Sequence, residues 1–173
     1  MDKRSLRYPN VLFDWGDTVM HDNPALTTPM VEWPKIKVVE GIAEVLQDLY
    51  ASGRRIILAT SASVSDEGQI RGALARVELD TYFSQIYCFK NTHLQKNEAF
   101  YHYVLNDLGI SAADALMVGD SFEKDVQTPN TLGIFAVWFN PVSDEIFNDE
   151  LHITVHSMQE LRAFFNSLDS NGV

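Results

Sequence analysis

The sequence predicts an α/β fold in which a parallel sheet is covered by helices on both faces. Short apolar runs, several of them β-branched, alternate along the chain with segments whose apolar residues have helical spacing. Strand and helix alternation of this kind is typical of parallel sheets. The 173 residues are 46% apolar and 21% charged, which suits one soluble globular domain.

Each element follows from its local pattern. The predicted strands span Asn10–Phe13, Arg55–Ala59, Gln85–Phe89, Ala115–Val118 and Ile134–Phe139. The predicted helices span Gly41–Tyr50, Val64–Val77, Glu98–Leu108 and Ser157–Leu168. Gly109 is a typical helix-ending residue, and Ser157 with Glu160 forms a capping pattern. Together they predict a single three-layer, Rossmann-like domain over residues 1–173, with its core at about 8–168.

Composition restricts the partners and the compartment. The formal net charge of −11 repels nucleic acid and anionic membranes, so neither is expected as a partner. The only cysteine, Cys88, excludes an internal disulfide and fits a reducing compartment. No apolar segment has the length of a signal sequence or a membrane span, and we therefore expect a cytoplasmic protein.

Polar side chains follow three of the predicted strands. They are Asp14 and Asp17 after the first strand, Thr60 and Ser61 after the second, and Asp120 and Asp125 after the fourth. Each alone could cap a helix or end a strand, but a parallel sheet brings the ends of its strands into one crevice. Carboxylates that converge there repel one another unless a cation neutralises them, and their oxygens suit Mg²⁺.

These motifs, in this order, resemble the haloacid dehalogenase superfamily, whose members are mostly phosphatases. The resemblance runs from about Tyr8 to Leu168. Asp14 is similar to the family's nucleophile, Thr60 to the hydroxyl that binds the transferring phosphoryl group, and Met117–Asp125 to the segment that holds magnesium.

The third family motif is a lysine that steadies the phosphoryl oxygens and the nucleophile. Lys96, just before a predicted helix, resembles it. The family's usual proline after this lysine is Asn97 here, and Lys90 lies only six residues earlier. Lys90 therefore stays an alternative.

The resemblance also implies a Mg²⁺ cofactor and a substrate-binding set. The expected metal ligands are the carboxylates of Asp14 and Asp120, the backbone carbonyl of Gly16, and Asp125 in a supporting position or through water. The residues expected to bind substrate are Ser61, Trp15 and Thr18.

Gly16 is a departure from the family pattern. Family phosphatases usually carry an aspartate two residues after the nucleophile, as general acid for the leaving group and base for water. Here Gly16 holds that position and Asp17 follows it. General acid–base help is worth about 10²–10⁴-fold. Asp17 is the candidate replacement, and the alternative is that it only hydrogen-bonds loop amides.

The resemblance implies a magnesium-dependent phosphomonoester phosphatase that acts on a small phosphorylated substrate through an aspartyl-phosphate. Gly16 keeps open a weakly active or inactive homologue that binds phosphate or a protein partner. A dehalogenase-type or phosphonatase-type hydrolase is a further alternative.

Neither gap between the motifs, Met20–Arg55 or Ser61–Gln95, leaves room for a separate cap domain. An open site counts against dehalogenation, which benefits from a dry pocket, and the lysine of phosphonate-cleaving members comes from a cap. Sites without a cap admit larger substrates or close with a partner subunit, so a homo-oligomer stays open. Residues 20–38 are the expected loop at the entrance, where His21, Asp22 and Trp33 either contact substrate or pack the loop.

Overall fold

The computed structural model describes residues 6–170 and contains one six-stranded sheet. All neighbouring strands are parallel, in the order β3-β2-β1-β4-β5-β6. The strands are β1 (Asn10–Phe13), β2 (Arg55–Ala59), β3 (Phe83–Tyr87), β4 (Ala115–Gly119), β5 (Phe135–Phe139) and β6 (His152–Val155). The central position of β1 puts its carboxyl end between those of β2 and β4.

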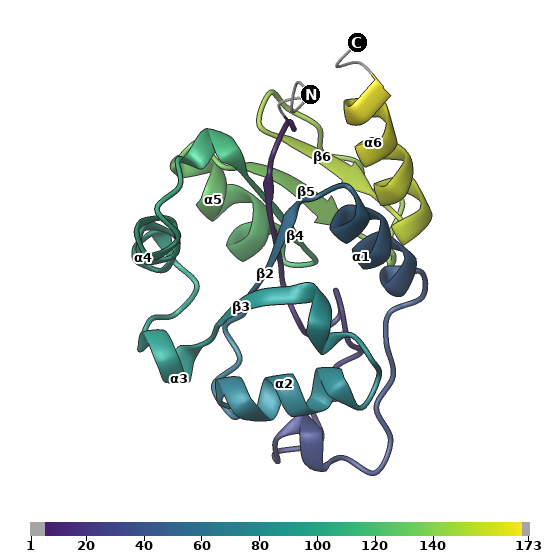
Figure 1. The fold of residues 1–173 in the computed structure, drawn as a ribbon, viewed down its shortest axis with the longest axis vertical. Coiled ribbons are helices and arrows are strands. Elements are labelled where there is room, and N and C mark those ends of the chain that lie inside the picture. The colour runs from purple at the N-terminus through teal and green to yellow at the C-terminus, as the bar shows by residue number, and fades with distance from the viewer. Residues whose placement is uncertain (1–5, 171–173) are drawn as a thin grey trace.

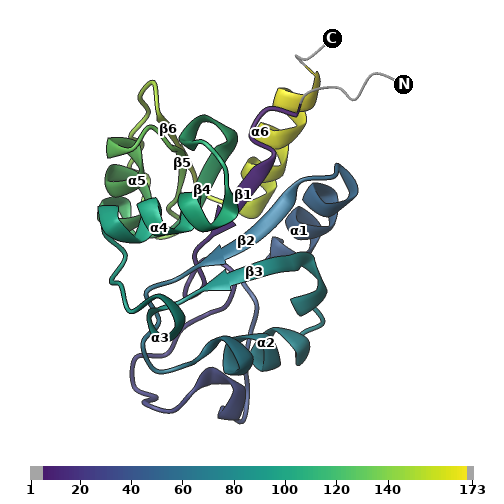
Figure 2. The same ribbon diagram turned by 60° about the vertical axis from the view of Figure 1, so that its left-hand side comes forward.

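Helices cover both faces of the sheet (Figures 1 and 2). The α-helices are α1 (Ile42–Ala51), α2 (Glu67–Ala75), α3 (Phe89–Thr92), α4 (Glu98–Leu108), α5 (Thr128–Thr131) and α6 (Met158–Ser170). Short 3-10 helices lie at η1 (Met30–Glu32), η2 (Asp80–Tyr82) and η3 (Ala112–Asp114), and a π-helix, η4, spans Phe122–Gln127.

Alternate residues of each central strand enter two different apolar cores. Val11 and Phe13 of β1 pack with α1, α2 and α6, whereas Leu12 packs with α4 and the segment after β4. All three side chains are fully buried. Burial on both faces explains why the central strands read as continuous apolar runs, and it confirms the three-layer α/β prediction.

The predicted helices are confirmed with small changes of bounds, and β4 and β5 differ from their predicted bounds by one residue each. The third strand needs correction, and a sixth strand was missed. The third strand is Phe83–Tyr87 and not Gln85–Phe89, because the backbone N–H of Cys88 donates to the Asn91 side chain and begins α3. The edge strand β6 was not predicted, since three of its four residues are only partly buried and its apolar pattern is weak.

The described chain has no separate cap domain. After β1 the chain makes a tight turn, pairs Met20 with Val38 in an isolated antiparallel bridge, and continues into α1. The intervening loop contains only η1, which lies next to α2 (Figure 1). None of the helices among residues 6–170 is long and apolar enough to cross a membrane.

Candidate active site

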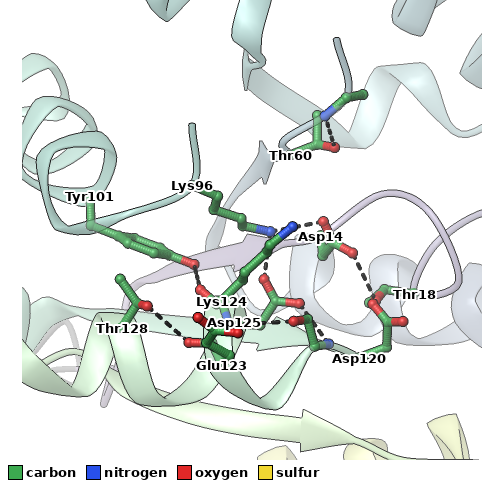
Figure 3. Close-up of polar contacts among 12 residues, drawn as sticks. Asp14, Thr18, Thr60, Lys96, Tyr101, Asp120, Glu123, Lys124, Asp125 and Thr128 are labelled. Carbon is green, nitrogen blue, oxygen red and sulfur yellow. Dashed lines mark hydrogen bonds and ion pairs between the residues drawn. The ribbon is translucent and has the colours of Figure 1, made fainter. Parts of the chain in front are cut away.

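Three carboxylates meet at the carboxyl end of the sheet. Asp14 directly follows β1, Asp120 directly follows β4, and Asp125 lies in the π-helix after it. Because β1 and β4 are neighbours, their ends bring one oxygen of each carboxylate within 4.8 Å of the others. Figure 3 shows the three side chains pointing toward one another.

Lys96 is the cation of this cluster. Its Nζ lies 2.8 Å from Asp14 Oδ1 and 2.6 Å from Asp125 Oδ1, and the residue is 5% exposed. Asn97, which replaces the family's proline, caps α4 by accepting the Phe100 N–H at 3.1 Å. Lys90 is an exposed residue of α3 and does not line the cavity at the cluster. The structure thus brings Lys96, and not Lys90, to Asp14.

Burial and crowding of negative charge change the acidity of the cluster. Burial raises the pKa of Asp120 to about 7, helped by the charge of Asp14. Burial likewise raises the pKa of Asp125 to about 6, against the opposing effect of Lys96. Burial would lower the pKa of Lys96, but Asp125 and Asp14 more than offset it, and the pKa is raised. Lys96 therefore stays charged. Its single positive charge is too small to keep Asp120 and Asp125 at their ordinary acidity.

Gly119, the last residue of β4, makes room for Asp125. A Cβ at Gly119 would overlap the Asp125 carboxylate, whose Oδ2 accepts the Ser121 N–H at 3.0 Å. Asp125 is 1% exposed and cannot move outward into solvent without breaking this packing. Glycine at position 119 is thus required for packing, because any side chain there would displace the Asp125 carboxylate.

The two threonines lie at different places. Thr18 is fully buried, with Oγ1 3.5 Å from Asp14 Oδ2 and 3.4 Å from Asp120 Oδ1, and it does not line the cavity. Thr60, at the end of β2, does line the cavity, and its Oγ1 accepts the Ala62 N–H at 3.0 Å. Ser61 and Trp15 also line the cavity, although Trp15 is only 5% exposed.

Asp17 is exposed and lines the cavity, but one of its oxygens is used by the loop. Its backbone has a left-handed φ of 57°, and its Oδ1 accepts the Asp22 N–H at 3.0 Å. Gly16 lies at the cavity, and its carbonyl accepts no hydrogen bond from residues 6–170. Gly16 thus has an unused carbonyl oxygen, whereas one oxygen of Asp17 already holds the loop.

The cavity over the cluster has a volume of about 410 Å³. The loop after β2 supplies small polar residues to its wall, and the entrance loop supplies Asp22 and Trp33, but not His21. The Trp33 indole N–H donates to the Thr28 carbonyl at 2.9 Å, so this ring also packs its own loop. Residues 20–38 do border the site.

Sequence reasoning missed Lys124 as a cavity residue. Its side chain lines the cavity, and its carbonyl accepts the Tyr101 hydroxyl at 2.7 Å (Figure 3). Helical periodicity could not have placed it, because the segment from Phe122 to Gln127 is a π-helix, which is rare and changes which residues share a face. Its only sequence signal is its place next to Asp125.

The donor set fits a hard divalent cation. When all three carboxylates are ionised, they face a single buried ammonium group, which leaves an excess negative charge of two. All available donors are oxygens, including the Gly16 carbonyl, and Mg²⁺ prefers such ligands. Asp14, Asp120, Asp125 and Gly16 are the residues that could hold it.

A parallel sheet covered by helices, with an acid cluster and a buried lysine at its carboxyl edge, is typical of hydrolases with a Rossmann-like fold. Comparison with known families agrees, since the model for haloacid dehalogenase-like hydrolases matches residues 20–139. The chain belongs to this family.

Two curated relatives have named activities. The chain is 35% identical over 72 residues to the pyrimidine 5'-nucleotidase PynA of Streptococcus pneumoniae, a match to 40% of this chain and 30% of that protein. It is 23% identical over 152 residues to the glyceraldehyde 3-phosphate phosphatase of Methanocaldococcus jannaschii, covering 82% of this chain and 64% of that protein. The chain thus spans less than two thirds of either relative.

Among solved structures, the HAD-hydrolase YfnB of Bacillus subtilis, crystallised with magnesium, has the same fold. The TM-score is 0.72 at 16% identity, over 92% of this chain and 99% of that chain. At this identity the likeness concerns the fold alone.

Proposed function

We propose that the protein is a magnesium-dependent phosphatase that hydrolyses small phosphate monoesters with Asp14 as the nucleophile. The observation that carries the proposal is the Asp14 carboxylate at the cavity, paired at 2.8 Å with buried Lys96 and flanked by Asp120 and Asp125. The phosphatase and nucleotidase activities in the names of the two relatives support it.

The reaction has two displacements at phosphorus. An Asp14 oxygen attacks the phosphorus, the bond to the ester oxygen breaks, and the leaving alcohol takes a proton. Water then attacks the phosphorus of the aspartyl-phosphate, gives its proton to a base, and releases inorganic phosphate and the Asp14 carboxylate. Covalent catalysis of this kind replaces one difficult step with two easier ones.

The surrounding residues bind and orient the phosphoryl group. Lys96 holds one Asp14 oxygen and offers positive charge to the phosphoryl oxygens, and the Thr60 hydroxyl and loop N–H groups can donate to them. Asp14, Asp120 and the Gly16 carbonyl would hold Mg²⁺, which would neutralise charge between the anionic nucleophile and the anionic substrate.

The test is metal-dependent turnover. Purified protein with Mg²⁺ is expected to hydrolyse p-nitrophenyl phosphate, and to lose this activity when EDTA removes the metal or when Asp14 is replaced in Asp14→Asn. Asp66→Asn, at the N-cap of α2 outside the cavity, is the matched control. A panel of phosphorylated metabolites then identifies the preferred ester. Absence of metal-dependent turnover across that panel would refute the proposal.

A second candidate function is phosphate binding with little turnover. Gly16 favours it, because this residue lacks the acid–base side chain that family phosphatases usually carry. In that case Mg²⁺ and phosphate would bind together in calorimetry, and every ester would be hydrolysed at a rate near that of Asp14→Asn. Carbon–halogen cleavage is disfavoured, since the three-carboxylate cluster suits a metal-assisted reaction of a phosphate.

A further inference from the structure

The space beside Gly16 is filled by another carboxylate. A Cβ built on Gly16 would lie 3.4 Å from Asp22 Cβ, 3.6 Å from Asp22 Cγ and 3.6 Å from Asp22 Oδ2. Both residues line the cavity that contains Asp14. Asp22 is six residues further along the chain, yet its side chain lies against the position where family phosphatases usually have an acid.

A hydrogen-bonded turn holds Asp22 in this place. The Asp17 N–H donates to the Met20 carbonyl at 2.6 Å, which reverses the chain after Gly16. The His21 N–H then donates to the Lys37 carbonyl at 2.8 Å, and the Asp22 N–H donates to Asp17 Oδ1 at 3.0 Å. These hydrogen bonds hold the backbone of Asp22 in place, although its side chain is exposed.

The two oxygens of Asp22 are in different states. Oδ1 accepts the Asn23 N–H at 2.8 Å. Oδ2, the oxygen nearer Gly16, has no hydrogen-bond partner among residues 6–170, so it is available to contact a ligand in the cavity. Asp17 also lines the cavity and has one free oxygen, but Asp22 is preferred because its carboxylate lies against the position of the missing side chain, whereas the Asp17 carboxylate holds the Asp22 N–H.

We propose that Asp22 is the general acid and base of the reaction and replaces the carboxylate missing at Gly16. This assignment rests on the phosphatase function proposed above. As the bond from phosphorus to the leaving oxygen breaks, the Asp22 carboxyl gives its proton to that oxygen. The resulting carboxylate then takes a proton from the water that attacks the aspartyl-phosphate, which restores the Asp22 carboxyl and balances the reaction.

The test compares two esters of similar shape, phenyl phosphate and p-nitrophenyl phosphate. Phenoxide is a poor leaving group, because phenols ionise only near pH 10, whereas p-nitrophenoxide needs little protonation. In Asp22→Asn we expect kcat/KM for phenyl phosphate to fall by about 10²–10⁴-fold. For p-nitrophenyl phosphate the fall should be at least about tenfold smaller. Asparagine keeps the acceptor for the Asn23 N–H, so the loop is preserved.

Two further variants make the assignment specific. Glu32→Gln removes an exposed carboxylate of the same loop that does not line the cavity, and it should behave as the unmodified protein. Adding Gly16→Asp to Asp22→Ala, which clears the space beside Gly16, should raise kcat/KM for phenyl phosphate at least about tenfold over Asp22→Ala alone, because a carboxylate returns to the usual position. Gly16 is not among the residues with a left-handed φ, and a Cβ there makes ordinary contacts.

The outcomes separate the two proposals. If the unmodified protein with Mg²⁺ hydrolyses neither ester nor any of the metabolite panel, the phosphatase function fails and the role of Asp22 fails with it. If the protein is active and Asp22→Asn lowers kcat/KM equally for both esters, or no more than Glu32→Gln does, the phosphatase function stands and the role of Asp22 is overturned.

Discussion

The buried Lys96 ammonium connects the nucleophile to the metal cluster. It contacts Asp14 and Asp125, and Asp125 is 1% exposed. Removing one partner of a buried ion pair leaves an uncompensated charge, which costs about 3–5 kcal/mol. We therefore expect Lys96→Met to lower the free energy of unfolding by about this amount without Mg²⁺, and to abolish turnover. Urea denaturation measures the first effect.

Lys90→Met is the control for this prediction. Lys90 is exposed on α3, and surface substitutions usually change stability by no more than about 0.5 kcal/mol. Similar losses of stability and activity in the two lysine variants would contradict the assignment of Lys96.

Asp17 acts on the loop that carries Asp22. Its carboxylate accepts the Asp22 N–H, and its φ of 57° is tolerated best by Asn, Asp and Gly. Asp17→Ala removes the acceptor and strains the backbone, whereas Asp17→Asn keeps both properties. We expect Asp17→Ala to lower kcat/KM by at least about fivefold more than Asp17→Asn, because a lost hydrogen bond is worth about 1 kcal/mol. An equal loss in both variants would show that the charge itself is required.

At the scale of elements, the end of β4 and the π-helix η4 form one unit with the active site. Gly119→Ala would drive a Cβ into the buried Asp125 carboxylate. Overpacking of this kind costs about 1–3 kcal/mol, and the displaced Asp125 can no longer pair with Lys96. We expect lower thermal stability together with a large loss of kcat.

Gly68→Ala is the matched substitution for Gly119→Ala. Gly68 lies in α2, where a Cβ would meet only Asp66 Oδ1 at 3.4 Å. Alanine in a helix is about 0.5–1 kcal/mol better than glycine, so this variant should be as stable as the unmodified protein or more stable. If Gly119→Ala behaved like Gly68→Ala in melting and activity, the packing argument for Gly119 would be wrong.

The elements that the sequence predicted best are those buried on one clear face or on both. β1 and β2 have their predicted bounds, and α4 agrees at both ends. The edge strand β6 was missed because His152 and its neighbours are half exposed. The π-helix was missed because its i→i+5 geometry leaves no familiar periodicity. Propensity and pattern thus describe the core better than the edges and the turns.

The candidate site was predictable where residue type and strand end coincide. Asp14, Lys96, Asp120 and Asp125 do converge in the structure. Asp22 was placed in the entrance loop, but its position over Gly16 depends on backbone hydrogen bonds across the turn, which no spacing rule contains. Closeness in the sequence therefore did not indicate that Asp22, rather than the adjacent Asp17, has its carboxylate against Gly16.

At the scale of the whole molecule, the acid cluster makes stability depend on pH. The pKa of Asp120 is about 7 in the folded state against 3.8 for the ordinary group, and that of Asp125 is about 6. At pH values between the ordinary pKa of 3.8 and the raised pKa, each of these two carboxyl groups is protonated in the folded state and ionised in the unfolded state. The contribution of these groups to the metal-free protein therefore falls as pH rises from about 4 to about 7.

Magnesium should reverse this trend. Mg²⁺ binds the ionised carboxylates, so it should raise Tm more at about pH 8 than at about pH 5.5. At a Mg²⁺ concentration of about 100 times Kd, the stabilisation is about 2.7 kcal/mol. In Asp120→Asn the metal-free protein should melt at a higher temperature at about pH 8, and its response to Mg²⁺ should be largely lost. Thermal scans with and without EDTA measure both effects, and a response to Mg²⁺ that is equal at both pH values would contradict them.

The measurement that tests the central claim most directly is the detection of phosphate on Asp14. The protein is mixed with Mg²⁺ and with a ³²P-labelled ester that it hydrolyses, and the reaction is quenched in acid during turnover. We expect label bound through an acyl phosphate that hydroxylamine releases, located at Asp14 and absent from Asp14→Asn. Steady turnover with no label on Asp14, or turnover that survives Asp14→Asn, would contradict the account.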